Sequence, residues 1–382
     1  MGCRTNGVSE HRGCPVKFSL GKSFTNSGVD IRQIVQDSRG KRLDHFASNE
    51  DEKNIHTYQI KFASVFKEGF NALYNTADDF HERCLEKMFY TEEESELFRT
   101  VLLANHLFGR LAANFGQNYF VSHDHHRSHD TYNKCPCYEC GEKIPYNNSG
   151  IGSEFLWYGY PDILVNSIGG STVIARPEEI DRDEQIAEGE VYFQADFDER
   201  QIIESEENIA LLRNERNVSK FVAQAVTFSF YQKFYQLKIN KNKSNILPVT
   251  LIPTLAVTGN HFDIYLYDHE HDILLRNKGP PIPLWKSEYP EAELDMSSVL
   301  KIWMVLNHLT LGTSLEEHIV QELQGSCDFL HALSSEHKTM IGQTIAKRFS
   351  MSNMWFNYSS STRSTEAVNC QSGPDLYWTS KI

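Results

Sequence analysis

The stretch Glu154-Phe155-Leu156-Trp157-Tyr158-Gly159-Tyr160-Pro161-Asp162-Ile163-Leu164-Val165 places an acidic residue at the start of an apolar run. Asp162 follows a glycine and a proline, which favour a turn, and three aliphatic residues come directly after it. A carboxylate in that position costs free energy unless a cation, a metal ion or several hydrogen-bond donors meet it. The stretch therefore predicts a buried strand with a functional carboxylate at Asp162 or, alternatively, an aspartate that caps the turn by accepting backbone N–H groups.

The length and composition of the chain set limits on its class. A chain of 382 residues can hold two average domains or one large domain with additions. Its apolar runs are far shorter than the roughly 18–20 residues that span a bilayer, and its first residues lack the apolar centre of a secretory signal. We therefore expect an intracellular protein, cytoplasmic or nuclear, without a membrane partner. The sequence does not predict the oligomeric state.

The charge is distributed unevenly along the chain. The formal net charge is −14, but residues 177–207 alone contain 13 Asp or Glu and two Arg. This acidic insert is either a solvated loop or a segment that lies over a basic groove and competes with its ligand. The rest of the chain is close to neutral, so a nucleic-acid partner stays compatible with the composition.

The spacing of apolar residues predicts the order of the secondary-structure elements. Thr91 and Glu94 form a capping-box pattern before an apolar helical stripe that ends near Gly116. Asn217 is the predicted N-cap of a second, long apolar helix at 218–235, which must pack against a sheet. Further strands are predicted at 171–175, 251–257, 262–267 and 273–275, and further helices at 299–309 and 315–333. The fold class is therefore α/β, with a mixed central sheet flanked by helices.

These elements divide the chain into successive regions. We expect a mobile N-terminal arm at 1–55, a helical region at 56–120 and a His/Cys-rich loop at 121–150. An α/β core that includes the acidic insert follows at 151–276, then C-terminal helices at 277–350 and a flexible tail at 351–382.

The His/Cys-rich loop contains candidate metal ligands. Cys135, Cys137 and Cys140 form a CxCxxC pattern, and four histidines lie just before them, between His123 and His129. Eight cysteines in the whole chain are too few for a disulfide scaffold. Three thiolates and one imidazole suit a tetrahedral structural Zn²⁺. The alternative is a polar surface loop with incidental cysteines.

The element order and one dipeptide together resemble the PD-(D/E)xK nuclease superfamily. The order is a helix, a meander of three strands, a buried helix and two or three further strands, and Pro161-Asp162 opens the second strand. The resemblance covers about residues 92 to 276. It implies a restriction-endonuclease-like core with helical N- and C-terminal additions. It also implies a nuclease that uses Mg²⁺ or Mn²⁺ to hydrolyse phosphodiester bonds of DNA or RNA.

The resemblance also assigns roles to particular residues. Asp162 would be the central metal ligand, and Glu154, on the preceding strand, would be an auxiliary acid. Gln224 resembles a glutamine that some exonuclease-like members carry on the corresponding helix. Lys220, on the same helix, could supply the missing positive charge from a different backbone position; alternatively, its side chain only extends from the helix end towards solvent.

The second half of the family motif departs from the pattern. If the partner strand is 171–175, the acid and lysine positions fall on Ile174 and Arg176, and the acid is missing. If the acidic insert delays the partner strand to 201–204, Glu204 becomes the acid and second Mg²⁺ ligand, and Glu206 replaces the lysine. A second carboxylate about 4–6 Å from Asp162 distinguishes an active site from an inactive one. The alternative function is therefore a catalytically inactive relative that acts as a nucleic-acid or protein interaction module.

Overall fold

A computed structural model shows how these elements are arranged. It describes residues 22–23, 73, 75–84, 88, 96–112, 119–122, 134–137, 139–147, 149–152, 157–167, 170–178, 206–239, 249–277, 279–287, 292–311, 313, 315, 317–324, 327–339 and 341. Most of the predicted N-terminal arm, most of the acidic insert and the whole predicted tail lie outside these residues.

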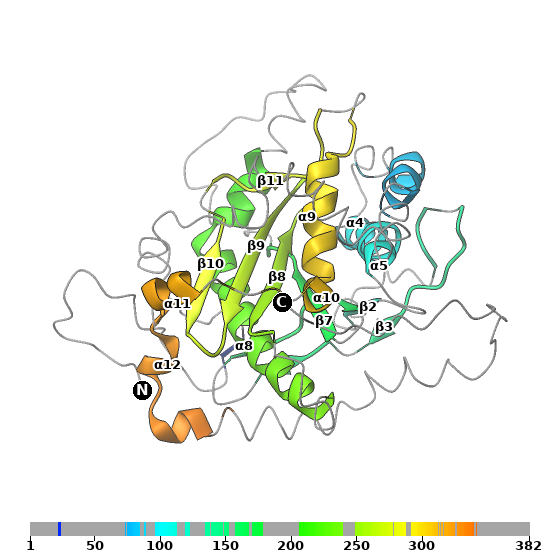
Figure 1. Cartoon of the computed structure of the whole chain (residues 1–382). Coiled ribbons are helices and arrows are strands. Elements are labelled where there is room, and N and C mark those ends of the chain that lie inside the picture. Colours follow the sequence, from blue (N-terminus) through cyan, green and yellow to red (C-terminus); the bar gives the residue numbers. More distant parts are fainter. Residues whose placement is uncertain are drawn as a thin grey trace, which may run out of the picture.

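The centre of the fold is an eight-stranded mixed sheet (Figure 1). Its strand order is β10-β9-β8-β7-β6-β2-β3, and β11 pairs with β9. β6 is antiparallel to both β2 and β7, β7 and β8 are parallel, and β9 is antiparallel to β8 and β10. The strands are β2 Tyr119–Ser122, β3 Tyr146–Asn147, β6 Ile163–Ser167, β7 Gly170–Ala175, β8 Leu251–Val257, β9 His261–Asp268, β10 Ile273–Arg276 and β11 Ile282–Pro283. The mixed α/β class is therefore confirmed.

The segment before Asp162 forms a second, three-stranded sheet, contrary to expectation. β5 Trp157–Gly159 lies between β1 Lys22–Ser23 and β4 Ile151–Gly152. The neighbour of β6 in the central sheet is β2 instead, so β2, β6 and β7 form the meander. Pro161 explains the break, because it has no N–H group to continue a ladder from β5 into β6.

Helices cover both faces of the central sheet. α8 Glu215–Ile239 packs on β7, β8 and β9, and its buried side chains form one core with Leu164, Val173 and Ile252. The opposite core contains Ile163, Ile174 and other side chains of the sheet with the helices of that side. Those helices are α4 Glu96–Leu102, the π-helix η2 Leu103–Phe108, α5 Gly109–Leu111 and α9 Met296–Leu306. Because successive side chains of a strand point to opposite faces, the strands contribute side chains to both cores.

The cap of α8 differs from the prediction. The helix begins at Glu215, and Asn214 caps it, because the Asn214 Oδ1 accepts the N–H of Arg216 at 2.9 Å. Asn217 lies inside the helix, where its side chain bonds the backbone of Glu178.

The C-terminal helices are more broken than predicted. α10 His308–Leu311 follows α9, and two short helices, α11 Glu317–Leu323 and α12 Phe329–Ala332, replace the single helix expected at 315–333. The turn at Asp272 explains the interruption, since its carbonyl accepts the N–H of Cys327 and its carboxylate accepts that of Leu330.

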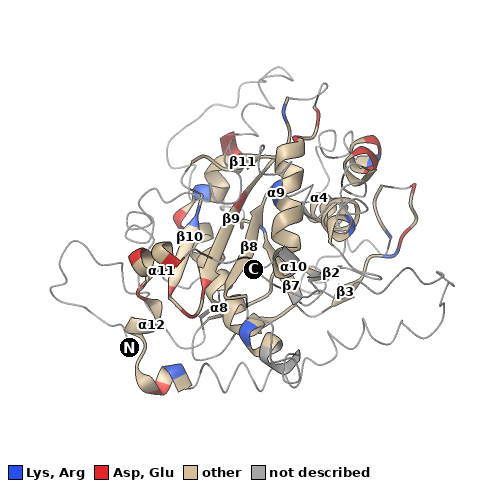
Figure 2. Ribbon diagram, viewed as in Figure 1, with Lys and Arg blue, Asp and Glu red and all other residues tan. Residues whose placement is uncertain are grey.

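Charged residues lie mainly away from the two cores. Figure 2 shows acidic and basic residues together near the ends of β9 and β10, where Asp263 pairs with Arg213 and Arg276. No helix among the described residues combines the length and the apolar character needed to cross a bilayer.

Candidate metal centre and candidate catalytic site

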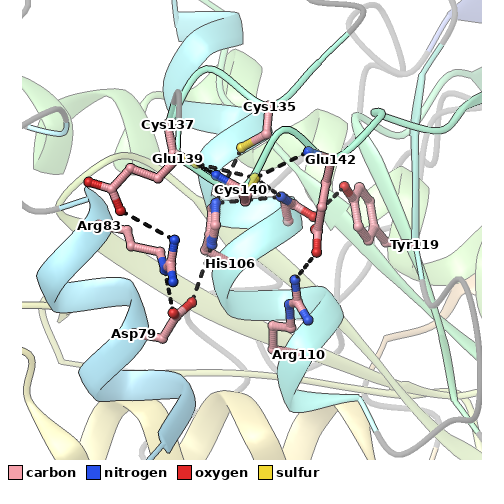
Figure 3. Close-up of polar contacts among 11 residues, drawn as sticks. Asp79, Arg83, His106, Arg110, Tyr119, Cys135, Cys137, Glu139, Cys140 and Glu142 are labelled. Carbon is pink, nitrogen blue, oxygen red and sulfur yellow. Dashed lines mark hydrogen bonds and ion pairs between the residues drawn. The ribbon is translucent and has the colours of Figure 1, made fainter.

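Four side chains converge to form a candidate metal centre on the α9 side of the sheet (Figure 3). The donor atoms of His106, Cys135, Cys137 and Cys140 all lie within 4.8 Å of one another. The Nε2 of His106 lies 3.2 Å from the Sγ of Cys135, and the sulfurs of Cys137 and Cys140 are also 3.2 Å apart. A tetrahedral zinc about 2.3 Å from each sulfur holds two sulfurs about 3.8 Å apart. The cluster could therefore hold a metal ion such as Zn²⁺ with little movement.

A tight loop presents the three thiols. Its ends meet at a bridge between Lys134 and Lys143, and the N–H of Cys135 bonds the carbonyl of Glu142 at 2.7 Å. Inside the loop, the N–H groups of Cys140 and Glu142 point at the sulfurs of Cys137 and Cys140, at 3.4 and 3.5 Å. Backbone N–H groups directed at sulfur favour the thiolate, which is the form that binds a metal.

The helix beneath the loop supplies the imidazole through a π-helical turn. In η2 the consecutive residues Asn105 and His106 both reach the loop, since the Asn105 amide contacts the Cys140 sulfur at 3.6 Å. A π-turn widens the helix locally and often marks a functional site. Gly109 ends this turn where no side chain fits, because an added Cβ would lie 2.6 Å from the Tyr119 ring.

A second layer of contacts orients the ligands. The Nδ1 of His106 faces the carboxylate of Asp79 at 3.4 Å, which leaves Nε2 directed at the sulfurs. Such a carboxylate fixes the tautomer of a ligating histidine and raises its basicity. The hydroxyl of Tyr119 donates to the Asn105 side chain at 2.9 Å and holds it beside Cys140.

Arginines tie the thiol loop to the helices. Arg83 bonds Glu139 at 3.2 Å and also pairs with Asp79, and Arg110 pairs with Glu142. These pairs are half exposed, so each contributes little stability alone. They therefore help to position the loop but contribute little to its stability.

The pKa values reflect the burial of the cluster. Burial raises the pKa of the Cys135 thiol to about 12 and lowers that of His106, which Asp79 counteracts only in part. In Cys137 burial acts to raise the pKa, but hydrogen bonds from Cys140 and Glu139 prevail and lower it. The thiolate forms of such buried cysteines are stabilised when a divalent cation compensates their negative charge.

The fourth ligand differs in origin from the sequence prediction. The expected histidine was one of those from His123 to His129, which lie outside the described residues. The structure instead brings His106, 29 residues before Cys135, to the cluster. A signal was present in the sequence, since Asn105 and His106 interrupt the apolar stripe of a buried helix.

The candidate catalytic site lies on the opposite face of the sheet, beneath the start of α8. Asp162 is 7% exposed and immediately precedes β6, and its Oδ2 accepts the N–H of Arg176 at 2.7 Å. Arg176 directly follows β7, the antiparallel neighbour of β6. This donor lies 14 positions along the chain, so the bond joins the ends of two neighbouring strands and is not the local turn cap of the alternative prediction, which required N–H groups two residues after Asp162.

Lys220 brings two carboxylates together. Its Nζ lies 3.9 Å from the Oδ2 of Asp162 and 3.6 Å from the Oε1 of Glu178, and it donates to the carbonyl of Arg176 at 2.9 Å. The side chain of Lys220 is only 10% exposed. A buried ammonium of this kind requires the nearby carboxylates to offset the cost of its burial.

Glu178 is a carboxylate beside Lys220 that the sequence analysis did not single out. The backbone N–H of Glu178 donates to the Oδ1 of Asn217 at 2.8 Å, and its carbonyl accepts from the Nδ2 at 3.1 Å. Arg216 also pairs with the Glu178 carboxylate at 3.2 Å. The helix thus holds Glu178 from two successive residues. No motif indicated it, because it lies beyond the strand that the family pattern uses.

The structure describes only some of the other predicted site residues. Glu154 and Glu204 lie outside the described residues, and so does the strand expected at 201–204. The partner strand of Asp162 is β7, and Ile174 belongs to the core on the α9 side of the sheet. Gln224 lies one helical turn after Lys220 and is fully buried, and neither its amide nitrogen nor its amide oxygen has a hydrogen-bond partner in the described part of the chain.

Comparison of the chain with protein-family models, with curated proteins and with solved structures finds no match. The function is therefore inferred from the geometry of these two sites.

Proposed function

We propose that the protein is a metal-dependent nuclease whose catalytic groups are Asp162, Glu178 and Lys220. The observation that carries the proposal is that two carboxylates, placed by the adjacent strands β6 and β7, lie within 4 Å of one buried ammonium group. Metal-assisted phosphodiester hydrolysis uses this combination of charges. Clusters of buried, mutually dependent ionisable groups occur often at active sites.

The connectivity of the sheet supports the same proposal. The meander β2, β6 and β7 is followed by α8 and then by β8 and β9, which is the order on which the resemblance to the PD-(D/E)xK superfamily rests. Two positions depart from the family pattern. The second acid comes from Glu178 rather than Ile174, and the lysine comes from α8 rather than from the strand.

Each residue of the site has a distinct chemical task. Asp162 and Glu178 offer the oxygen ligands that Mg²⁺ and Mn²⁺ prefer. The metal, when bound, polarises the phosphoryl oxygen and lowers the pKa of the attacking water. Lys220 holds a positive charge where negative charge develops on the phosphate. Both amide atoms of Gln224 are buried without a hydrogen-bond partner in the described part of the chain, so they can orient a water molecule or Lys220. Glu154 and Glu204 stay predictions as further acids.

The alternative is an inactive, nuclease-like interaction module. It is favoured by the position of Lys220 itself, because its ammonium already pairs with both carboxylates without a metal. Mg²⁺ would then have to compete with a covalently attached cation, and this ion gives up its waters reluctantly.

Cleavage and metal titration decide between the two functions. Asp162→Asn and Glu178→Gln should each abolish Mg²⁺- or Mn²⁺-dependent cleavage of DNA or RNA and weaken Mn²⁺ binding in calorimetry. Glu317→Gln, on the exposed surface of α11, is the matched control and should change neither. If wild type binds Mn²⁺ no tighter than Asp162→Asn, the site is not a metal site and the interaction module is the better proposal.

For the His/Cys cluster we propose a structural Zn²⁺. Four protein ligands close the coordination sphere, which is typical of structural rather than catalytic zinc. The bound ion would fix the thiol loop to η2 and contribute to folding. Elemental analysis should find about one zinc per chain. The double variant Cys137→Ser and Cys140→Ser should lose it, whereas Cys327→Ala, a buried cysteine outside the cluster, should keep it.

A further inference from the structure

Two arginines share one buried carboxylate of β9, apart from the two candidate sites. The side chain of Asp263 is fully buried. The Nη2 of Arg213, just before α8, lies 3.4 Å from the Oδ2 of Asp263. The Nη2 of Arg276, the last residue of β10, lies 3.5 Å from the same oxygen. One negative charge therefore faces two positive charges.

The charges around this cluster do not cancel its excess positive charge. Burial raises the pKa of Asp263 to about 6, and in the described part of the chain only the charges of Arg213 and Arg276 act on it, against this rise. Glu215 and Arg216, both exposed in the first turn of α8, add one charge of each sign. The nearest acidic residue before Arg213 is six helical positions away, about 9 Å along the axis.

Most N–H donors of the two guanidinium groups have no protein partner. The Nη2 of Arg213 donates to Asp263 and to the carbonyl of Gly279, and the Nη2 of Arg276 donates to Asp263. Among the described residues no other hydrogen bond uses either group, and the Nε of Arg276 is buried without a partner. The contacts with Asp263, at 3.4–3.5 Å, are longer than the roughly 2.7–2.9 Å of a strong charge-assisted hydrogen bond. Both groups can therefore donate to a further anion.

Packing fixes where the two guanidinium groups lie. That of Arg276 lies over the ring of Tyr265, 5.3 Å from its centre. The Tyr265 ring is fully buried and packs on Phe221 of α8, with ring centroids 5.7 Å apart. The carbonyl of Gly279 holds Arg213, whose side chain is 28% exposed. The pair is thus preorganised within reach of solvent, which lowers the entropic cost of binding a ligand.

The arginine pair lies at the same end of the sheet, and on the same face, as the candidate catalytic site. Asp263 pairs with Ala256 of β8, and Ala256 pairs with Ala175 of β7. Both alanines belong to the core that contains α8, so Asp263, in register with them, faces α8 too. Two strand spacings are about 10 Å, which is the distance from Asp263 to Ala175 along the sheet. The residue after Ala175 is Arg176, whose N–H bonds Asp162.

We propose that Arg213 and Arg276 form a binding site for one phosphate group. A guanidinium group presents a planar fork of N–H donors that matches a phosphate in geometry and in charge. The phosphate belongs to the backbone of the nucleic acid that is cleaved beside Asp162, and this source of the phosphate rests on the proposed function. The contact fixes the position of the strand along the sheet and reads no sequence.

Inorganic phosphate, without divalent metal, tests the site separately from cleavage. Titration calorimetry at constant ionic strength should detect binding to wild type. Arg213→Gln should weaken that binding about 10- to 150-fold, because it removes charge-assisted hydrogen bonds. Lys338→Gln, at an exposed lysine of the C-terminal region, is the matched control and should bind as wild type.

Two lysine variants separate binding from folding. Arg213→Lys and Arg276→Lys keep the positive charge that the buried Asp263 requires, so both should melt close to wild type in thermal denaturation. A lysine lacks the planar fork, so both should bind phosphate more weakly than wild type. Lys220→Met should bind phosphate as wild type, which distinguishes this site from the candidate catalytic one.

An oligonucleotide identifies the source of the phosphate. A fluorescein-labelled oligothymidylate of about 15 nucleotides covers typical single-strand site sizes, and anisotropy follows its binding without divalent metal. Arg213→Gln should weaken this binding. It should also lower the slope of log affinity against log salt by about 0.7, the contribution of one phosphate contact in a single strand.

The outcomes are separable from those of the cleavage assay. If wild type binds no inorganic phosphate, or if Arg213→Gln and Arg276→Lys bind it within about twofold of wild type, the site is refuted, even when Asp162→Asn abolishes cleavage. If phosphate binding depends on the two arginines and oligonucleotide binding does not, the site takes a free phosphate or a mononucleotide, and its role for nucleic acid is refuted. If both depend on the arginines and no protein form cleaves, the phosphate site stands and the protein is an interaction module.

Discussion

Replacing Lys220 by methionine should separate the stability of the candidate catalytic site from its chemistry. Methionine keeps most of the volume of the buried stem and removes the ammonium group, which lies 3.9 Å from Asp162 and 3.6 Å from Glu178. Unit charges 3.9 Å apart attract by about 4 kcal/mol at an effective dielectric constant of about 20. The desolvation of both groups offsets part of that attraction.

The expected loss of stability follows from the charge left behind. Removing one partner of a buried pair costs about 3–5 kcal/mol. We expect about 3 kcal/mol for Lys220→Met, because Asp162 keeps the hydrogen bond from the Arg176 N–H at 2.7 Å. At about 2–4 °C per kcal/mol, the melting temperature in metal-free buffer should fall by roughly 6–12 °C.

Metal binding should change in the opposite direction. Without the competing ammonium, Asp162 and Glu178 should bind Mn²⁺ at least about tenfold more tightly. The bound ion should restore part of the lost melting temperature. Cleavage should still be lost, because the positive charge that Lys220 offers to the phosphate is gone.

Calorimetry with Mn²⁺, thermal denaturation and an oligonucleotide cleavage assay measure the three effects. Lys233→Met, on the same helix and away from the two carboxylates, is the matched control and should behave as wild type. The reasoning is refuted if Lys220→Met melts within about 2 °C of wild type and binds Mn²⁺ with unchanged affinity, since the carboxylates would then not share the ammonium.

Two further predictions concern the metal centre and a buried histidine. Asp79→Asn removes the carboxylate beside His106 and should weaken zinc affinity about 10- to 100-fold, measured in competition with a chromophoric chelator. Asp78→Asn, at the exposed neighbouring position, is the control and should leave the affinity unchanged. If both variants bind zinc equally well, Asp79 does not orient His106. Burial lowers the pKa of His308 to about 4, so the unfolded chain takes up a proton first as the pH falls, and stability is lost below about pH 6.5. The contribution of His308 should therefore lower the free energy of unfolding, measured in urea, by about 2 kcal/mol between pH 7 and pH 5. His308→Gln should make the free energy of unfolding less dependent on pH. An unchanged pH dependence in the variant would show that His308 does not cause it.

The sequence by itself determined the elements of the fold and part of each site. Alternating and helical spacings located β6, β7, β8, β9 and α8, because these patterns depend only on which face of an element is buried. Pro161-Asp162 and the three cysteines were found because their chemistry is concentrated in a few consecutive residues. Lys220 was identified as a cation that could reach the site from the helix, and the structure places it beside Asp162.

Only the tertiary structure decided which distant residues join the two candidate sites. His106 reaches Cys135 across 29 positions through a π-turn, and Glu178 reaches Lys220 because Asn217 holds its backbone. Neither contact produces a periodic pattern in the sequence, since both depend on the packing of separate elements. The same reason applies to β5, whose apolar residues indicated a strand but not the sheet it would join. Pairing partners are chosen by long-range contacts, which local patterns do not encode.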